Sequence, residues 1–118
     1  MARLELHDNQ LVLALSTLEH GEALHGDLRA SLAAVRDIRA VPDAWPEIHG
    51  LRAPGTGVPG VVMVGTLRDH GSKDFAAVHG TGPAVVVELE GTEFRRWILT
   101  DDDAAQAVVE LRLGVGLA

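Results

Sequence analysis

The residue pattern that most resembles a known reactive site is the glycine string at residues 55–60, which matches the G-x-G-x-x-G sequence of dinucleotide-binding folds. In those folds a strand precedes the string and a helix follows it, so that the helix amides meet the pyrophosphate. Here Pro54 precedes the string, Pro59 removes one amide, and a mostly β-branched run follows at residues 61–64. We therefore interpret the string as a loop that leads into a strand, and we reject nucleotide binding.

The segment Gly71-Ser72-Lys73 is a weaker match, to the phosphate-binding loop of nucleotide hydrolases. That loop has a lysine followed by serine or threonine, and then a helix. Here the serine precedes the lysine and no helical pattern follows. A hairpin turn between two strands is the better interpretation of this segment.

Histidines and aspartates raise the question of a metal site. The six histidines are His7, His20, His25, His49, His70 and His79. No two of them have the i, i+4 spacing that places two imidazoles on one face of a helix, so surface histidines are the simpler interpretation. Asp101, Asp102 and Asp103 lack the spaced oxygen ligands and the glycine of a calcium loop. They suit the first turn of a helix, where negative charge is favoured, and we expect neither a metal nor a cofactor.

The candidate ligand-binding residues are Arg52, Arg68 and Lys73. All three lie on or beside loops that border the strand expected over residues 61–67. If these loops meet at one rim, the three side chains form a local cationic spot that suits a small anionic ligand. No serine lies in a G-x-S-x-G turn, and two carboxylates near a strand end, Glu88 and Glu90, are expected to face water. We therefore predict no catalytic residues, and a protein that is not an enzyme.

The composition indicates one ordered domain over residues 1–118 with an aliphatic core, because 47% of the residues are apolar but only 3% are aromatic. The absence of cysteine excludes disulfides, thiolate metal sites and cysteine nucleophiles. A net charge of −7 opposes binding to nucleic acid and to anionic membranes. No run is long and apolar enough to span a membrane, and the first residues lack the apolar centre of a signal peptide. We therefore expect a cytoplasmic protein.

The pattern of polar and apolar residues predicts strands near the N-terminus and again over residues 61–99. Residues 3–7 and 10–15 flank Asp8 and Asn9, which favour a tight turn, so the chain is expected to open with a β-hairpin. Four further strands are expected, over residues 61–67, 74–79, 84–89 and 94–99. Short strands separated by turn residues in this way are typical of an antiparallel barrel or sandwich.

A C-terminal helix is the clearest element in the pattern. It is expected over about residues 101–113, with Thr100 as its N-cap and Gly114 as its stop. Residues 16–41 are ambiguous, because their leucines recur at helical spacing whereas two glycines interrupt them. Residues 42–59 hold four prolines and are expected to be rich in loops, with no long regular element.

The chain resembles the short bacterial pleckstrin-homology-like domains of actinobacterial hypothetical proteins. The resemblance rests on the run of residues 50–60, the strand at 61–66, and the segments 73–78 and 83–89 that follow it. It implies a strongly bent antiparallel barrel or orthogonal sandwich of about seven strands, capped by the C-terminal helix. It also implies that residues 28–30 and 35–41 are strands. Lipid-binding members of the wider group hold inositol phosphates with Lys and Arg near the first hairpin, whereas the turn here is Asp8 and Asn9.

Without reactive groups, a stable aliphatic domain is best suited to interaction. We expect a non-enzymatic module that binds a protein partner or further copies of itself, and that binds neither nucleic acid nor membranes strongly. The alternative is a domain that binds a small anionic ligand through Arg52, Arg68 and Lys73.

Overall fold

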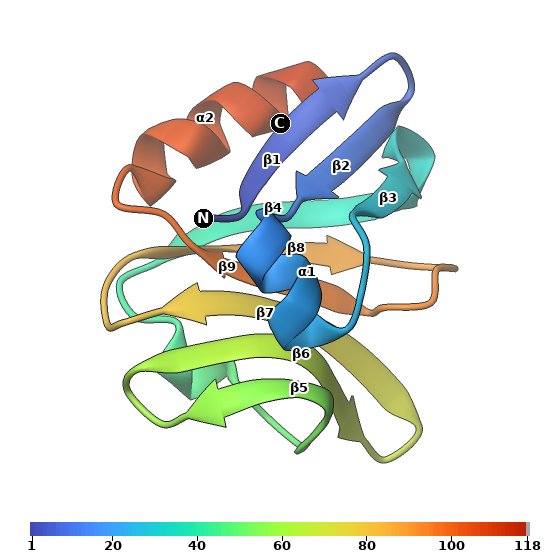
Figure 1. Ribbon diagram of the computed structural model, residues 1–118. Helices are drawn as coiled ribbons and strands as arrows, with labels where there is room; N and C mark the ends of the chain where they lie inside the picture. The colour runs from blue at the N-terminus through green and yellow to red at the C-terminus, as the bar shows by residue number, and fades with distance from the viewer. Residues whose placement is uncertain (118) are drawn as a thin grey trace.

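The computed structural model describes residues 1–117, with the main chain alone for residues 51–54, and consists mainly of two β-sheets and two α-helices (Figure 1). The smaller sheet has the order β1-β2-β3, from β1 (Arg3–His7), β2 (Gln10–Ala14) and β3 (Leu28–Ser31). The larger has the order β4-β8-β9-β7-β6-β5, from β4 (Val35–Val41), β5 (Leu51–Val58), β6 (Val62–Asp69), β7 (Ser72–His79), β8 (Ala84–Leu89) and β9 (Arg96–Thr100). The helices are α1 (Thr17–Ala23) and α2 (Ala104–Val115), with 3₁₀ turns η1 (Leu32–Ala34) and η2 (Trp45–Glu47).

The mainly β fold and the C-terminal helix are confirmed, but of the predicted antiparallel barrel or orthogonal sandwich the barrel does not form, because the described sheets do not close. The described strands form two separate sheets, and β7 and β9 run parallel, with Asp74 opposite Arg96 and Ala77 opposite Leu99. The cause lies in the connection at residues 80–83, which carries β8 past the position next to β7 and leaves that position for β9. Side-chain alternation identifies a strand but not its neighbour, so the sequence pattern could not reveal this insertion.

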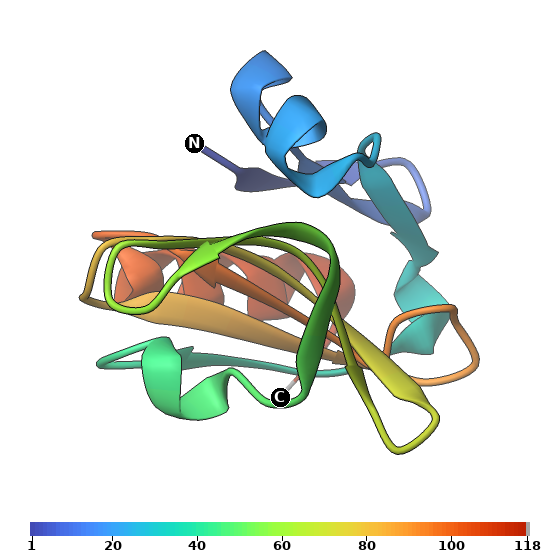
Figure 2. The same cartoon turned by 60° about the horizontal axis from the view of Figure 1, so that its bottom comes forward.

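The two faces of the large sheet bury different clusters, as alternation along its strands requires. Figure 2 shows the small sheet and α1 over one face and η2 near the other. The first face packs against β2 and α2 through a core that includes Phe75, Trp97 and Leu99. The second packs against Ala44 and Trp45 of the η2 segment through residues such as Ile98. Burial on both faces explains why the central strands are almost continuously apolar.

The N-terminal part confirms the predicted hairpin and resolves the ambiguous segment. Asp8 adopts a left-handed φ of 53° in the turn between β1 and β2. Ser16 caps α1 by accepting a hydrogen bond from the Glu19 amide, and the Glu19 carboxylate accepts one from the Ser16 amide in return. Beyond this one short helix, β3 and β4 form where the resemblance implies strands. The leucine spacing thus indicated a longer helix than exists. The helix ends at Leu24, and Leu28 and Val35 are buried in strands, because tertiary packing outweighs helix propensity there.

The expectation of a loop over residues 42–59 is wrong, because β5 occupies much of it. This strand is the outermost of the large sheet and pairs antiparallel with β6. Its register shifts between Arg52 and Gly55, the segment that holds Pro54. An edge strand with an irregular register tolerates proline, whose missing amide would break a central ladder. The glycine string therefore runs from β5 through the turn at Gly60 toward β6, with a strand and not a helix after it.

The helix α2 begins and ends later than expected. Thr100 does not cap it, because this residue pairs with Ala84 in the sheet and its hydroxyl accepts a hydrogen bond from the His79 amide. The Asp101 carboxylate accepts a hydrogen bond from the Asp103 amide in the turn before the helix. The helix ends at Gly116, whose φ of 86° only glycine adopts readily. Among the described residues, no helix is both long and apolar enough to cross a membrane.

Candidate functional site

The structure brings together two of the three predicted cationic residues. Arg68 on β6 lies directly opposite Lys73 on β7, next to the turn formed by His70 and Gly71. Lys73 is half-buried, and its Nζ lies 2.9 Å from the Glu93 carboxylate and 5.8 Å from the centre of the Phe94 ring. The main chain of Arg52 lies opposite that of Leu67, but the side chain of Arg52 is outside the described residues.

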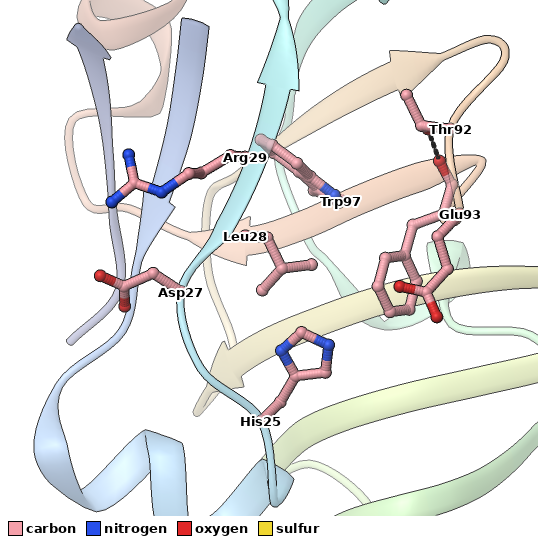
Figure 3. Close-up of a pocket in the computed structure, with 8 residues that line it drawn as sticks. His25, Asp27, Leu28, Arg29, Thr92, Glu93 and Trp97 are labelled. Atoms are coloured by element: carbon pink, nitrogen blue, oxygen red, sulfur yellow. Dashed lines mark hydrogen bonds between the residues drawn. The ribbon is translucent and has the colours of Figure 1, made fainter.

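Lys73 borders a cleft that the sequence analysis did not identify. The cleft has a volume of about 190 Å³ and lies between the start of β3 and the turn that leads into β9 (Figure 3). Its lining residues are His25, Asp27, Leu28, Arg29, Thr92, Glu93, Phe94 and Trp97. An engineered apolar cavity of roughly 150 Å³ holds benzene, so this space suits a molecule of about one ring.

Local hydrogen bonds fix the wall of the cleft that precedes β3. The helix α1 ends at Leu24, which has a left-handed φ of 53° and turns the chain toward β3. The Asp27 carboxylate accepts hydrogen bonds from the Leu15 amide at 2.8 Å and from the His20 ring at 2.7 Å. These two hydrogen bonds lower the pKa of Asp27 below its ordinary value, and the bond from Leu15 has the larger effect. This loop is therefore tied to the end of β2 and to α1.

Aromatic rings pack against one another beside the cleft. The ring of His25 lies 5.4 Å from that of Phe75 and 5.7 Å from that of Phe94, and the two phenylalanine rings are 5.6 Å apart. Tilted and edge-on contacts at these distances are the favoured ones for aromatic pairs. Trp97, which is 2% exposed, completes the lining from the first part of β9.

Among the described residues, two buried side-chain polar atoms have no hydrogen-bond partner, Glu22 Oε1 and an atom of Trp97 that belongs to the cleft lining. Its indole Nε1 is buried and has no hydrogen-bond partner among the residues that the structure describes. The other tryptophan, Trp45, donates its Nε1–H to the Gly80 carbonyl at 2.9 Å. A buried donor without a partner costs about 1–3 kcal/mol. Native proteins keep few such groups, and each one calls for an explanation.

His25 adds a second polar group to the cleft. Its Nδ1 lies 2.7 Å from the Gly26 carbonyl oxygen, which can only accept, so Nδ1 carries the proton. In the neutral ring Nε2 is then a free acceptor. In Figure 3 the His25 ring points toward Leu28 and the interior of the cleft, whereas the charged ends of Asp27 and Arg29 extend to the other side of Leu28.

The turn before β9 supplies the remaining polar lining. The Thr92 hydroxyl donates to the Phe94 carbonyl at 2.6 Å, which fixes the turn. The hydrogen bond from Lys73 lowers the pKa of Glu93, so this carboxylate is ionised and paired at neutral pH. Lys73, which was predicted to contact a ligand, is therefore already paired with Glu93.

Most of the histidines singled out in the sequence are engaged by carboxylates. Four histidines contact carboxylates, in the pairs His7–Glu5, His20–Asp27, His70–Asp69 and His79–Glu19. Within the described part of the chain, no three His, Asp or Glu side chains lie together as metal ligands would. Chemically, the cleft combines the unpaired indole N–H of Trp97, the imidazole acceptor of His25 and apolar walls, an arrangement suited to binding a small molecule.

A second hollow lies on the other side of the large sheet, and its arginines are committed to ion pairs. It has a volume of about 300 Å³ and is lined by His49, Glu88, Arg95 and Arg96. Arg95 and Arg96 both bind Asp74, at 3.2 Å and 2.8 Å. The cationic side chains of this hollow thus hold the fold together.

A third, more apolar groove of about 260 Å³ separates β1 from α2. Its lining consists of Arg3, Leu4, Leu6, Asp101, Ala107, Glu110 and Leu111. The two elements approach closely, since a Cβ on Gly114 would lie 2.3 Å from the Leu6 side chain. In the described sheet β1 pairs with β2 alone, so its other edge faces outward.

Comparisons with known proteins gave no match, whether with family models, with curated proteins or with solved structures.

The decisive residues of the cleft come from distant parts of the sequence. His25 precedes β3 and Trp97 lies in β9, and no motif links them. The one signal in the sequence that points to this cleft is the rarity of aromatic residues, which make up 3% of the chain. Phe75, Phe94 and Trp97 either contact the His25 ring or line the cleft with it.

Proposed function

We propose that the protein is a non-enzymatic binding module whose cleft at Trp97 takes a small molecule. The unpaired, buried Nε1 of Trp97 supports this proposal most directly. A ligand that offers an acceptor to this nitrogen removes the cost of its desolvation, and a concave, mostly apolar space with a few polar groups is the usual form of a small-molecule site.

The two tryptophans provide the test, because they give two indole signals in a ¹H–¹⁵N spectrum. We expect ring-sized fragments to shift the signal of Trp97 and to leave that of Trp45 in place. Trp97→Phe should weaken the binding of such a fragment, and Trp45→Phe should not. If no fragment at millimolar concentration moves the Trp97 signal, the cleft is not a ligand site.

Self-association is the second candidate function, favoured by the outward edge of β1 and the apolar groove beside it. An unpaired edge strand is a template for pairing with another strand, and a second copy of β1 would extend the small sheet across a two-fold axis. Light scattering after size-exclusion chromatography should show a dimer that Leu6→Lys disrupts. Leu24→Lys is the control, because Leu24 is exposed but lies outside the groove. A strict monomer at high concentration would exclude this function.

The family and the anionic ligand stay predictions. The abundance of strands and the C-terminal helix support a pleckstrin-homology-like domain, whereas the parallel pair β7–β9 does not suit the barrel that this family implies. Arg68 and Lys73 lie together as an anionic ligand would require, but Glu93 already binds Lys73.

A further inference from the structure

The charge and hydrogen-bonding groups of the Trp97 cleft restrict the chemistry of its ligand. We propose that the cleft selects a neutral, planar ring that carries both a hydrogen-bond acceptor and a hydrogen-bond donor, as a cyclic amide does. This inference rests on the proposed small-molecule function and specifies the ligand class.

The first restriction comes from Trp97. Indole Nε1–H is a donor only, so the part of the ligand that reaches the floor of the cleft must be an acceptor. The Trp97 side chain is 2% exposed and its nitrogen has no solvent contact. A ligand therefore meets this donor only when it is seated deep between Leu28 and Phe94, which are 4% and 5% exposed.

The second restriction comes from His25. Because Nδ1 donates to the Gly26 carbonyl, the neutral ring presents an acceptor at Nε2. The ring is held against Phe75 and Phe94, which fixes the direction of that acceptor. A ligand that satisfies both side chains at once must carry a donor as well as an acceptor.

The third restriction is electrostatic. The charged residues at or beside the cleft are two acids, Asp27 and Glu93, and three bases, Arg29, Lys73 and the Arg68 that lies opposite Lys73. Glu93 is paired with Lys73, and Asp27 is paired with His20. The interior of the cleft is apolar, and burial of an unpaired charge there is unfavourable. A neutral ligand is therefore favoured over an anion.

Shape supplies the last restriction. The walls are a leucine and aromatic rings, and the volume of about 190 Å³ fits one flat ring better than a branched or extended chain. A six-membered lactam combines flatness with a carbonyl acceptor directly beside an N–H donor.

The test uses three probes with a single ring, two of equal size and one slightly larger. These are 2-pyridone, which has the acceptor and the donor; 2-pyranone, in which oxygen replaces the N–H; and benzoate, which is an anion. Titrations follow the Trp97 indole signal at pH 8, where an ordinary imidazole is neutral. We expect 2-pyridone to bind about tenfold more tightly than 2-pyranone, which corresponds to one hydrogen bond, and benzoate to bind least.

Two variants assign the recognition to its residues. His25→Phe keeps an aromatic ring but lacks the acceptor, so the preference for 2-pyridone over 2-pyranone should disappear. Trp97→Phe should weaken both neutral probes, with binding followed by calorimetry because the indole signal is lost. Trp45→Phe, which changes the tryptophan outside the cleft, should leave both affinities unchanged.

The outcomes separate this inference from the function on which it rests. Equal binding of 2-pyridone and 2-pyranone, tightest binding of benzoate, or a preference that survives in His25→Phe would each overturn the ligand class and leave a small-molecule site in place. If these probes and a general fragment set all leave the Trp97 signal unmoved, both proposals fail.

Discussion

Arg96 and Trp97 are neighbours on β9 and are both buried, yet their polar groups have opposite fates. The Arg96 guanidinium faces the η2 side of the sheet and donates to the Asp74 carboxylate at 2.8 Å, to the Glu47 carboxylate at 3.1 Å and to the Glu47 carbonyl at 2.8 Å. The Trp97 indole faces the other side and donates to no described residue. Strand β9 therefore has a hydrogen-bonded guanidinium on one face and an unpaired indole donor on the other.

The difference shows how the two faces divide their tasks. On the η2 side, Arg39 and Arg96 both bind Glu47, so the network ties the η2 segment to the sheet. Such networks fix a structure because breaking one leaves a buried charge uncompensated. On the cleft side, the unpaired Nε1–H of Trp97 does not stabilise the fold. The free-energy cost of burying this donor is recovered only when an added molecule accepts its hydrogen bond.

The largest expected effect breaks the saturated side. Arg96→Ala leaves Asp74, which is 3% exposed, without its best-buried partner, and we expect it to lower the free energy of unfolding by about 3–5 kcal/mol. Urea denaturation measures this loss. Arg36→Ala is the control, since the Arg36–Glu90 pair is exposed and should contribute less than about 1 kcal/mol. Equal losses in the two variants would remove the basis of the comparison.

A smaller effect extends the comparison to Glu19, another saturated buried group. Glu19 is 1% exposed and accepts hydrogen bonds from the Ser16 and Ala2 amides and from His79. Burial raises its pKa, but the bonds from Ser16, His79 and Ala2 outweigh burial and hold the pKa below the ordinary 4.5. Since the folded state binds this proton less readily, the stabilisation by Glu19 is complete above pH 4.5 and is lost as the pH falls through the lowered value.

Glu19→Gln is therefore expected to be less stable than the parent at pH 7, by about 1–3 kcal/mol, and the gap should narrow below pH 4.5. Urea denaturation from pH 7 down to pH 3.5 follows the gap. Glu110→Gln, at an exposed position of α2, should show a gap near zero throughout. A Glu19→Gln gap that widens in acid would contradict the assigned direction.

The smallest expected effect is spectroscopic and needs no ligand. A hydrogen-bonded indole proton resonates downfield of an unbonded one, so the Trp45 signal should lie downfield of the Trp97 signal. Trp45→Phe assigns the two signals by deleting one. A Trp97 signal at or downfield of the Trp45 position would show that its Nε1 is already bonded, and the two faces would then be alike.

Local patterns predicted most of the strands but not their partners. Alternation located β1 and β2 closely, and apolar runs between turn residues located β6, β7 and β8. A strand with one buried face alternates, whereas a strand buried on both faces is apolar almost throughout. The position of β9 between β8 and β7 depends on how the chain passes residues 80–83. The proline at position 54 hid β5, since its position at the sheet edge is a tertiary property.

The candidate site was harder to predict than the fold. Arg68 and Lys73 lie opposite each other because they flank one tight turn, and their role in binding a ligand stays a prediction. His25 and Trp97 meet only through the stacking of the two sheets, so neither spacing nor composition points to both. The start of α2 also illustrates this limit, since Thr100 has the chemistry of an N-cap but pairs within the sheet.

The place of β9 has a consequence for biogenesis. Among the described strands this one comes after all the others in sequence, yet it occupies an interior position of the large sheet between β8 and β7. During translation the earlier strands emerge first and leave exposed, hydrogen-bonding edges on β7 and β8 until residues 96–100 leave the ribosome. Non-local pairing of this kind slows folding. The nascent chain therefore passes through a stage in which β7 and β8 are open to pairing with an extended segment of another molecule in place of β9.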